Sequence, residues 1–428
     1  MNYQIKNIEI KTGDDLIIGI DSFSFSKHGP VFITGKSGAG KTVFLRFLAG
    51  YLDFFEDSLI IKADFCSGKE KFDWKDYCLK KDNNFYLGQD IDNFVTGLYI
   101  FDEIYSSVGD RKKAENIIAD HIFFDPYRKL SELSQGQKKL VLILKALFSG
   151  CDNIFLDEPF TYLDREERDK VSEIIRIFSE SGKTVYIAGH GMELFHLEFT
   201  SIFEIDNGNI NEIDKKIIRK RFYNVKSELR ALRKGHDNSK CGFISLNDIF
   251  FSYNDRKIFD GESFAFDKGV INGLCGRNGS GKTTLAKILC NRLKIRSGNA
   301  DFDRNAVFIA NNPDMYFLTG TCEEELEFFS SEKRQKILSS LDFDVSGKRI
   351  SELSYGQKIR FLIYIYLNLE KDVFILDEIF AGQDMGNIRR LSDFLRSLSA
   401  KGKTVIIITQ DVFVVRMIAD RIVRIEKP

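Results

Sequence analysis

The sequence predicts an α/β fold that occurs twice along the chain, each time around a mainly parallel sheet. A glycine-rich loop ending in Lys-Thr occurs at Gly35–Thr42 and again at Gly276–Thr283, directly after a compact apolar run typical of a buried strand. A Leu-Ser-x-Gly-Gln segment recurs at Leu133–Gln137 and Leu353–Gln357. An apolar run ending in Asp-Glu follows this segment at the same interval in both copies, which indicates a duplicated α/β unit.

Length, charge and cysteine content limit the possible classes of protein. A chain of 428 residues suggests two to three domains, and the repeat reduces this to two. We expect a first domain at 1–210, a basic linker at 211–242 and a second domain at 243–428. The net charge of −1 argues against a dedicated nucleic-acid-binding protein, which usually carries a basic surface. The seven cysteines are scattered, which predicts reduced thiols rather than a metal site.

The sequence shows no segment expected to enter a membrane. No run approaches the ~20 apolar residues that a membrane-spanning helix needs. The first six residues lack the apolar core of a signal peptide. Work at a membrane would therefore require a partner protein.

The segments around the first glycine loop predict its structural context. Residues 8–25 alternate apolar and polar side chains, which predicts antiparallel strands with one exposed face in a smaller β subdomain. A helix is expected over 43–52. The first copy is then longer than the second by a lysine-rich stretch at 63–84 that contains Trp74, and we interpret it as a polar surface insertion.

The two glycine-rich loops have the sequence of phosphate-binding P-loops. Glycines let backbone N–H groups turn toward phosphate oxygens, and the following helix adds the positive end of its dipole. Lys41 and Lys282 would reach the β- and γ-phosphates, while the hydroxyls of Thr42 and Thr283 would bind Mg²⁺. The predicted phosphate-binding residues are Gly35, Lys36, Ser37, Gly38, Ala39, Gly40, Lys41 and Thr42 in the first copy, and Gly276, Arg277, Asn278, Gly279, Ser280, Gly281, Lys282 and Thr283 in the second.

The Leu-Ser-x-Gly-Gln segments each precede an apolar helix, expected at 138–148 and 358–369. Burial alone would explain the apolar helices but not the repeated start. Serine at a helix N-cap followed by glycine presents a second anion-binding helix end. The nucleotide contacts predicted here are Ser134, Gly136, Gln137, Ser354, Gly356 and Gln357.

Acidic pairs end the apolar strands that follow. Asp157 and Asp377 suit the coordination of Mg²⁺, while Glu158 and Glu378 can orient and deprotonate an attacking water. A lone Asp-Glu pair could equally be an exposed strand end. Its matched spacing beside a P-loop in both copies favours the catalytic interpretation.

Two further strand ends carry polar side chains. His190 and Gln410 lie at the same interval after the acidic pair of their copy. A histidine there can hydrogen-bond the γ-phosphate and the attacking water, although a lone histidine is more often structural. Between the copies, residues 211–240 carry ten Lys or Arg against four Asp or Glu. We expect a solvated linker, with a patch facing anionic lipid or an acidic partner as the alternative.

Together these motifs resemble the ATP-binding cassette (ABC) ATPases over essentially the whole chain, twice. The glycine loops match the Walker A motif, the Leu-Ser-x-Gly-Gln segments the signature motif, and the acidic pairs Walker B. Asp164 and Asp384 match the D-loop, Gln89 the Q-loop and His190 the switch histidine. The resemblance implies two tandem P-loop domains, each with a helical subdomain that carries the signature motif. It also implies ATP and Mg²⁺ as cofactors.

The resemblance further implies that ATP is held between the Walker A loop of one domain and the signature motif of the other. Site one would use the first copy's Walker motifs, and site two those of the second. Thr12 stands in the first copy where an aromatic residue normally stacks on adenine, a role that Tyr253 keeps in the second. Metal ligands would include Gln89 and its counterpart Asn311, which is one methylene shorter.

The substitutions in catalytic positions fall in site two, where Gln410 replaces the switch histidine and cannot act as a cation or proton shuttle. We therefore hypothesise that site one hydrolyses ATP and that site two binds ATP tightly but turns over slowly.

Residues 311–325 are similar to the corresponding region of energy-coupling factor (ECF) or cobalt-type importers. That narrower resemblance implies a fused ATPase subunit at the cytoplasmic face of the membrane, bound to separate ECF T-like and substrate-binding membrane proteins. No nucleic-acid partner is expected. The alternatives are a soluble twin-cassette ATPase acting in translation or on nucleic acid, and an ATP-dependent regulatory protein.

Overall fold

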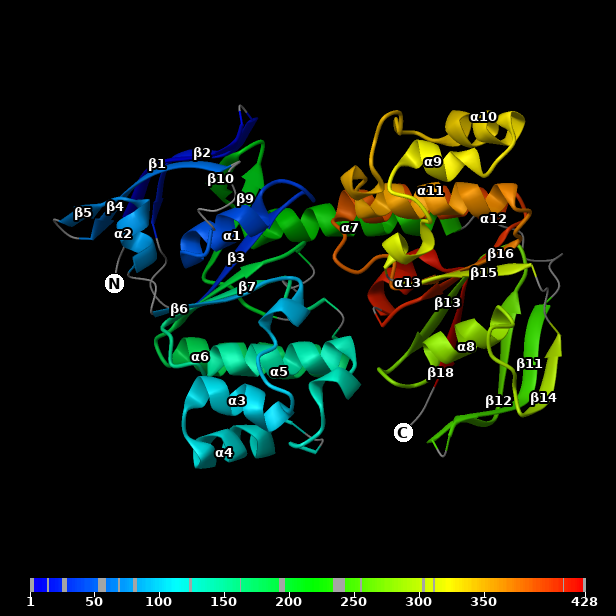
Figure 1. The fold of residues 1–428 in the computed structure, drawn as a ribbon, viewed down its shortest axis with the longest axis horizontal. Helices are drawn as coiled ribbons and strands as arrows, with labels where there is room; N and C mark the ends of the chain where they lie inside the picture. The colour runs from blue at the N-terminus through cyan, green and yellow to red at the C-terminus, as the bar shows by residue number, and fades with distance from the viewer. Residues whose placement is uncertain are drawn as a thin grey trace. The chain divides into compact units, whose positions relative to one another are not determined.

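The computed structural model divides the chain into two compact units (Figure 1). The first unit comprises Met1–Phe222 with Gly382–Asp384, and the second comprises Tyr223–Ala381 with Met385–Pro428. The structure describes residues 4–13, 15–24, 29–52, 59–67, 70–79, 83–122, 125–161, 163–191, 197–233, 243–254, 256–301, 305–310, 312–410 and 412–425.

The first unit contains an antiparallel sheet and a mainly parallel sheet. The antiparallel sheet has the order β2-β1-β4-β5. The second sheet has the order β10-β9-β3-β8-β7-β6, and only β10 in it is antiparallel to its neighbour. The strands are β1 (Gln4–Thr12), β2 (Asp15–Ser24), β3 (Gly29–Gly35), β4 (Leu59–Ser67), β5 (Glu70–Phe72), β6 (Asn84–Leu87), β7 (Asn153–Asp157), β8 (Thr184–Ala188), β9 (Ser201–Asp206) and β10 (Asn209–Glu212).

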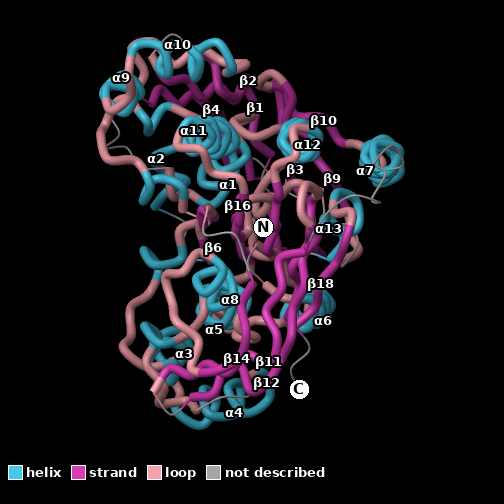
Figure 2. The backbone as a smooth tube through the Cα atoms, turned by 90° about the vertical axis from the view of Figure 1, so that its right-hand side faces the viewer, coloured by secondary structure: helices cyan, strands magenta, loops and turns pink. Residues whose placement is uncertain are grey.

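Helices cover the mainly parallel sheet. Figure 2 shows α3 and α4 beside α5, and α3 contacts both in the structure, so these three form the predicted helical subdomain. The apolar face of α5 joins the largest core cluster of the unit. The helices are α1 (Lys41–Ala49), α2 (Trp74–Leu79), the short η2 (Ile91–Phe94), α3 (Ile100–Val108), α4 (Arg111–His121), the short η3 (Leu130–Glu132), α5 (Gln135–Leu147) and α6 (Arg165–Glu180).

The second unit repeats this plan with fewer strands. Its antiparallel sheet has the order β12-β11-β14, and its parallel sheet has the order β15-β16-β17-β13-β18. The strands are β11 (Phe243–Tyr253), β12 (Arg256–Asp267), β13 (Ile271–Gly276), β14 (Ser297–Asp301), β15 (Ala306–Ile309), β16 (Val373–Asp377), β17 (Thr404–Ile408) and β18 (Arg421–Ile425). The helices are α8 (Lys282–Leu289), η6 (Pro313–Tyr316), α9 (Cys322–Glu327), α10 (Ser331–Ser340), η7 (Ile350–Glu352), α11 (Tyr355–Asn368), α12 (Met385–Ala400) and α13 (Val412–Ile418).

The basic stretch between the copies is largely helical. Helix α7 (Lys215–Arg233) crosses the boundary between the units. Ile218 packs in the core of the first unit and Leu229 in that of the second. Two of its basic side chains form ion pairs: Lys215 lies 2.6 Å from Glu198, and Arg221 pairs with Glu204. Residues 234–242 of the expected linker lie outside the described part of the chain.

The lysine-rich stretch at 63–84 differs from the polar surface insertion that its composition suggested. It supplies most of β4, all of β5 and all of α2, and it buries Phe65, Trp74 and Tyr77. Trp74 stacks on Phe47 of α1 with ring centroids 4.7 Å apart. The Tyr77 hydroxyl donates a 2.6 Å hydrogen bond to the backbone oxygen of Leu48. Exposed lysines surround these aromatic residues in the sequence, so the average polarity of the stretch does not show that the three residues belong to a hydrophobic core of the first unit.

The sequence predicts no membrane-spanning helix and reduced cysteines. Within the described residues, no helix combines the length and the apolar character needed to span a membrane. Six of the seven cysteines are described, and all six are free thiols. The seventh, Cys241, lies outside the described part.

Candidate nucleotide-binding sites

The first P-loop joins the carboxyl end of β3 to the start of α1. Gly38 and Gly40 have φ of 80° and 93°, a left-handed conformation that other residues adopt at a cost. A Cβ atom on Gly40 would approach Cγ2 of Ile17 to 2.9 Å, so both space and backbone angle require glycine here. The Lys41 ammonium donates to the backbone oxygens of Gly35 and Lys36, each at 3.0 Å, and is thereby held over the loop.

The second P-loop repeats this geometry between β13 and α8. Gly279 and Gly281 have φ of 74° and 103°. The Lys282 ammonium donates to the backbone oxygens of Gly276 and Arg277 at 2.7 and 2.8 Å. The Ser280 hydroxyl is buried and makes no hydrogen bond with any residue that the structure describes. Each unit thus holds a lysine and a ring of backbone N–H groups where phosphate oxygens would bind.

The predicted metal-binding aspartates lie beside the P-loop threonines. The Asp157 carboxyl is 3% exposed, and within the described residues its Oδ2 has no hydrogen-bond partner. Burial raises the pKa of Asp157, opposed by the Thr42 hydroxyl. Asp377 accepts a 3.0 Å hydrogen bond from the Thr283 hydroxyl, and burial likewise raises its pKa. A buried carboxylate beside a hydroxyl offers the hard oxygen ligands that Mg²⁺ prefers, so both donor sets fit that ion.

The carboxylate of Glu158 is the centre of a hydrogen-bond network. It accepts from the Gln89 amide at 3.1 Å and the Thr161 hydroxyl at 3.3 Å, and it lies 3.0 Å from Nε2 of His190. The structure therefore brings three predicted catalytic residues together, and adds Thr161, which the motif spacing did not identify. Burial opposes ionisation of Glu158, but the hydrogen bond and charge of His190 outweigh it and hold its pKa below the usual value.

The corresponding Glu378 has a different environment. Its carboxylate accepts from the Thr409 hydroxyl and from the backbone N–H of Gln410, each at 2.9 Å. Gln410 therefore contacts the glutamate through its backbone. Thr409 is a further contact that the motif spacing does not identify, apart from its place before Gln410. Burial and the adjacent charge of Asp377 raise the pKa of Glu378 to about 7. Asn311, predicted to act here, lies outside the described residues.

The signature segments form capped helix ends. The Ser134 hydroxyl accepts from the Gln137 backbone N–H at 3.1 Å, while the Gln137 side chain accepts from the Ser134 N–H at 3.2 Å. Ser354 and Gln357 form the same reciprocal pair. Gly136 and Gly356 lie in the first turn of α5 and α11, and a Cβ atom on Gly356 would meet no atom within 4 Å. The helices begin three residues earlier than predicted because the cap fixes the first turn.

Two further positions concern the base of the nucleotide. Tyr253 ends β11, is 43% exposed and meets Phe251 edge-to-face at 4.9 Å. Thr12 ends β1 and is exposed. An aromatic surface for a purine is therefore present at this strand end in the second unit and lacking in the first.

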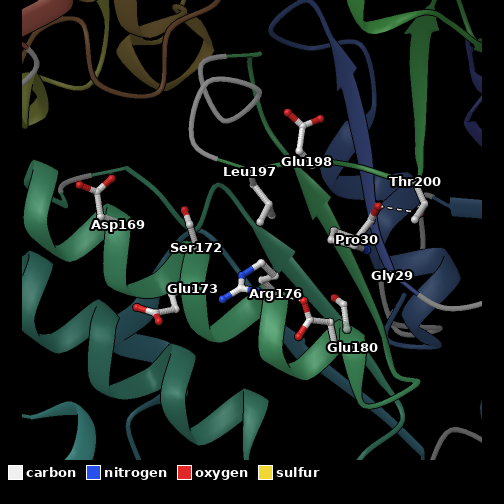
Figure 3. Close-up of a pocket in the computed structure, with 11 residues that line it drawn as sticks. Gly29, Pro30, Asp169, Ser172, Glu173, Arg176, Glu180, Leu197, Glu198 and Thr200 are labelled. Carbon is white, nitrogen blue, oxygen red and sulfur yellow. Dashed lines mark hydrogen bonds and ion pairs between the residues drawn. The ribbon is translucent and has the colours of Figure 1, made fainter.

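A cavity of about 590 Å³ lies elsewhere in the first unit, along α6 (Figure 3). Asp169, Glu173, Glu180 and Glu198 line it, with Arg176 as its basic residue. No P-loop residue contributes to its walls, and their negative charge would repel a triphosphate. In the second unit Arg396, which corresponds to Arg176, is instead held by both carboxylate oxygens of Asp420 at 2.7 Å.

A protein-family model described as ABC transporter matches residues 20–161 and 259–381, which make up more than half of the chain. The chain belongs to the ABC transporter family. One match falls in each unit, so the predicted tandem arrangement is confirmed. The predicted enzyme class is also confirmed: this ABC protein is an ATPase that binds ATP, and domains of this family generally use Mg²⁺ with it.

Relatives and solved structures agree with this assignment. The ABC protein is 26% identical over 432 residues to a Treponema denticola protein, covering 91% of this chain and 88% of the relative. It is also 26% identical over 498 residues to a Bacillus cereus protein, covering 98% of this chain and 87% of the relative. Both are named "Putative ABC transporter ATP-binding protein". A solved RNase-L Inhibitor has a TM-score of 0.71 at 21% identity over 97% of this chain and 87% of that one, a likeness that confirms the two-domain fold alone.

Proposed function

We propose that this ABC ATPase hydrolyses ATP with the catalytic groups of its first unit and couples hydrolysis to solute transport through separate integral membrane proteins. The observation that supports the hydrolytic part is the network on Glu158, in which a carboxylate with a lowered pKa meets Gln89 and His190. The partner-binding part is supported by exposed apolar side chains close to the Q-loop. The ECF-type import that the sequence resemblance implies is the form of transport we propose.

In the proposed reaction, Lys41 and the P-loop N–H groups bind the phosphates of ATP. Thr42, Asp157 and the Gln89 amide oxygen would hold Mg²⁺, which neutralises charge that develops on the phosphates. Glu158 accepts a proton from the attacking water and orients it in line with the γ-phosphate. His190 donates a hydrogen bond that keeps the Glu158 carboxylate fixed. The nucleophile is water and the products are ADP and phosphate.

The second unit is proposed to bind ATP and to turn it over slowly. Its P-loop, Asp377 and Tyr253 supply phosphate, metal and base contacts. Its Glu378 carboxylate accepts from the Thr409 hydroxyl and the Gln410 backbone N–H instead of meeting an imidazole, and burial raises its pKa, which makes it a poorer match to Glu158 as a base. Following the family resemblance, we propose that each nucleotide also contacts the signature helix end of the other unit, which intramolecular cysteine cross-linking would test.

Apolar side chains near the Q-loop are proposed as the docking surface for cytoplasmic segments of the membrane partners. Leu98 is 73% exposed in the first unit, and Met315 and Leu318 are 77% and 78% exposed in the second. In each unit a buried glutamate fixes the backbone of the loop that carries these apolar residues. Glu103 accepts from the Gly97 N–H at 2.7 Å, and Glu325 from the Leu318 N–H at 2.9 Å. Rigidly presented, highly exposed apolar residues are typical of protein contact sites.

Co-purification tests this proposal. The chain is expressed with its neighbouring genes, solubilised in mild detergent and purified through a tag on the ATPase. We expect an integral membrane protein to remain bound, and Leu98→Glu or Leu318→Glu to release it. Leu79→Glu is the matched control, because Leu79 is 80% exposed but ends α2, which precedes β6, whereas Gln89 of the Q-loop follows β6. Recovery of ribosomes or nucleic acid in place of a membrane protein would favour the soluble twin-cassette alternative.

A further inference from the structure

A buried lysine connects the signature helix of the first unit to its Walker B turn. Lys139 lies in α5 and is 1% exposed. An ammonium group is costly to bury unless it makes strong hydrogen bonds. Its Nζ donates to the backbone oxygen of Glu158. The helix that Ser134 caps thus contacts the residue proposed as the catalytic base through the backbone oxygen of that residue.

The backbone of Glu158 needs such support. Its φ of 49° is left-handed, a conformation that glutamate adopts only when its surroundings enforce it. Pro159 follows, and the residue before a proline is pushed toward extended conformations. The same carbonyl accepts from the Thr161 backbone N–H, but at the long distance of 3.3 Å. Lys139 therefore stabilises the turn at Glu158, whose left-handed backbone the following Pro159 disfavours.

The second unit makes the same turn without a lysine. Glu378 has a φ of 52°, but Ile379 follows it, so no proline restricts it. Its carbonyl accepts from the Ala381 N–H at 3.0 Å, a shorter turn bond than in the first unit. Ile359 occupies the position of Lys139 and is fully buried in the apolar core. Thus the first unit has a proline after the glutamate and a lysine in the signature helix, whereas the second unit has isoleucine at both positions.

We propose that Lys139 is a positioning residue for ATP hydrolysis in the first unit. Its ammonium fixes the Glu158 turn so that the carboxylate meets Gln89 and His190. This inference rests on the proposed role of Glu158 as the base. Lys139 donates to the Glu158 carbonyl, whereas the P-loop residue Lys41 donates to the carbonyls of Gly35 and Lys36. Loss of Lys139 should therefore lower the rate of hydrolysis more than it lowers the affinity for ATP.

The test measures kcat and KM for ATP in the full-length protein. Lys139→Ile is expected to lower kcat by ~10-fold to ~100-fold, because small misplacement of a catalytic group has effects of that size, with KM changed less than about twofold. Lys139→Arg keeps a cationic donor and should recover most of the lost kcat. Lys138→Met is the matched control: Lys138 is the adjacent residue and pairs instead with Asp92 at 2.6 Å, so kcat should stay near that of the parent.

A double variant separates positioning from folding. Lys139→Ile combined with Pro159→Ile recreates the residue pair of the second unit, where the same turn forms. It should recover part of the kcat lost in Lys139→Ile, because the proline no longer opposes the turn. Unfolding of each variant is followed by fluorescence of Trp74, the only tryptophan, which lies in the first unit.

The outcomes distinguish this inference from the proposed function. If Glu158→Gln abolishes hydrolysis while Lys139→Ile stays within about twofold of the parent kcat, the inference is wrong and the role of Glu158 stands. If Glu158→Gln leaves hydrolysis intact, the proposed function fails instead. A parallel rise in KM, an early Trp74 transition, or no recovery in the double variant would assign Lys139 a merely structural role and overturn the inference.

Discussion

Glu158 and Glu378 come directly after equivalent strands, follow identical Leu-Asp sequences and share a left-handed backbone, yet their carboxyl groups differ chemically. His190 and Gln89 contact Glu158, and its pKa lies below the usual value. The Thr409 hydroxyl and a backbone N–H contact Glu378, and its pKa is raised to about 7. Desolvation acts on both, and in the part of the chain that the structure describes, a histidine opposes it at Glu158 and none does so at Glu378.

This difference shows that the pKa of a Walker B glutamate depends on neighbouring residues that lie outside the Walker B motif. The contrast extends to the helices after the signature segments. Helix α5 carries two buried lysines, Lys139 and Lys145, where α11 carries Ile359 and Ile365. The first unit therefore anchors its loops to this helix with ammonium groups, and the second relies on apolar packing.

The largest expected effect compares the two glutamates directly. Glu158→Gln should lower ATP turnover by ~10²-fold to ~10⁴-fold, the usual effect of losing a general base. Glu378→Gln should cost less than about threefold, since Glu378 contributes little turnover in the proposed function. Phosphate release at saturating ATP measures both. Equal losses in the two variants would contradict the proposed asymmetry.

The residue at the switch position, His190 in the first unit and Gln410 in the second, allows a second comparison of the two units. His190→Gln removes the imidazole that contacts the Glu158 carboxylate, and we expect a ~10-fold to ~100-fold loss of phosphate release. Gln410→His supplies an imidazole to the second unit and should raise its turnover above that of a Glu158→Gln parent. An unchanged rate in the second experiment would show that the histidine is not what separates the units.

The buried ion pair between Lys145 and Glu103 allows a stability comparison. Glu103 is fully buried and, besides Lys145, accepts from the backbone N–H groups of Thr96 and Gly97. Lys145→Ile should lower the free energy of unfolding by about 3 kcal/mol, the low end for breaking a buried pair, because those donors remain. Urea unfolding followed by Trp74 fluorescence measures it. In the second unit Glu325 is also buried while Ile365 occupies the position that corresponds to Lys145, so the variant should still fold.

Much of the fold follows from residues whose chemistry is tied to backbone geometry. Glycines with required left-handed angles, such as Gly40 and Gly281, fix the strand–loop–helix order. Runs such as Val373–Asp377 are apolar on both faces, which predicts strands of a parallel sheet. Both features are local, and the predicted α/β fold with tandem P-loop domains is confirmed.

The remaining features depend on burial, which the sequence does not show directly. Lys139 and Ile359 occupy equivalent positions in the repeat, but a lysine after a signature segment predicts only a solvated side chain. Thr161 and Thr409 contact the glutamates from different loops, so no shared spacing identifies them. The stretch at 63–84 is polar on average, and composition therefore does not predict that Phe65, Trp74 and Tyr77 are buried in it.

The smallest expected effect concerns that stretch, which the second unit lacks. Tyr77→Phe deletes the hydroxyl that donates to the Leu48 carbonyl at 2.6 Å and accepts from the Asn84 amide at 3.3 Å. We expect a loss of about 1 kcal/mol in the free energy of unfolding, since one buried carbonyl loses its donor while the Asn84 amide keeps the Ala49 carbonyl. Tyr105→Phe is the control, because Tyr105 is 43% exposed and water replaces its contacts. Trp74 packs against Tyr77, so its fluorescence reports this unit directly. Equal midpoints for the two variants would mean that the buried Tyr77 hydroxyl adds nothing to the stability of the first unit.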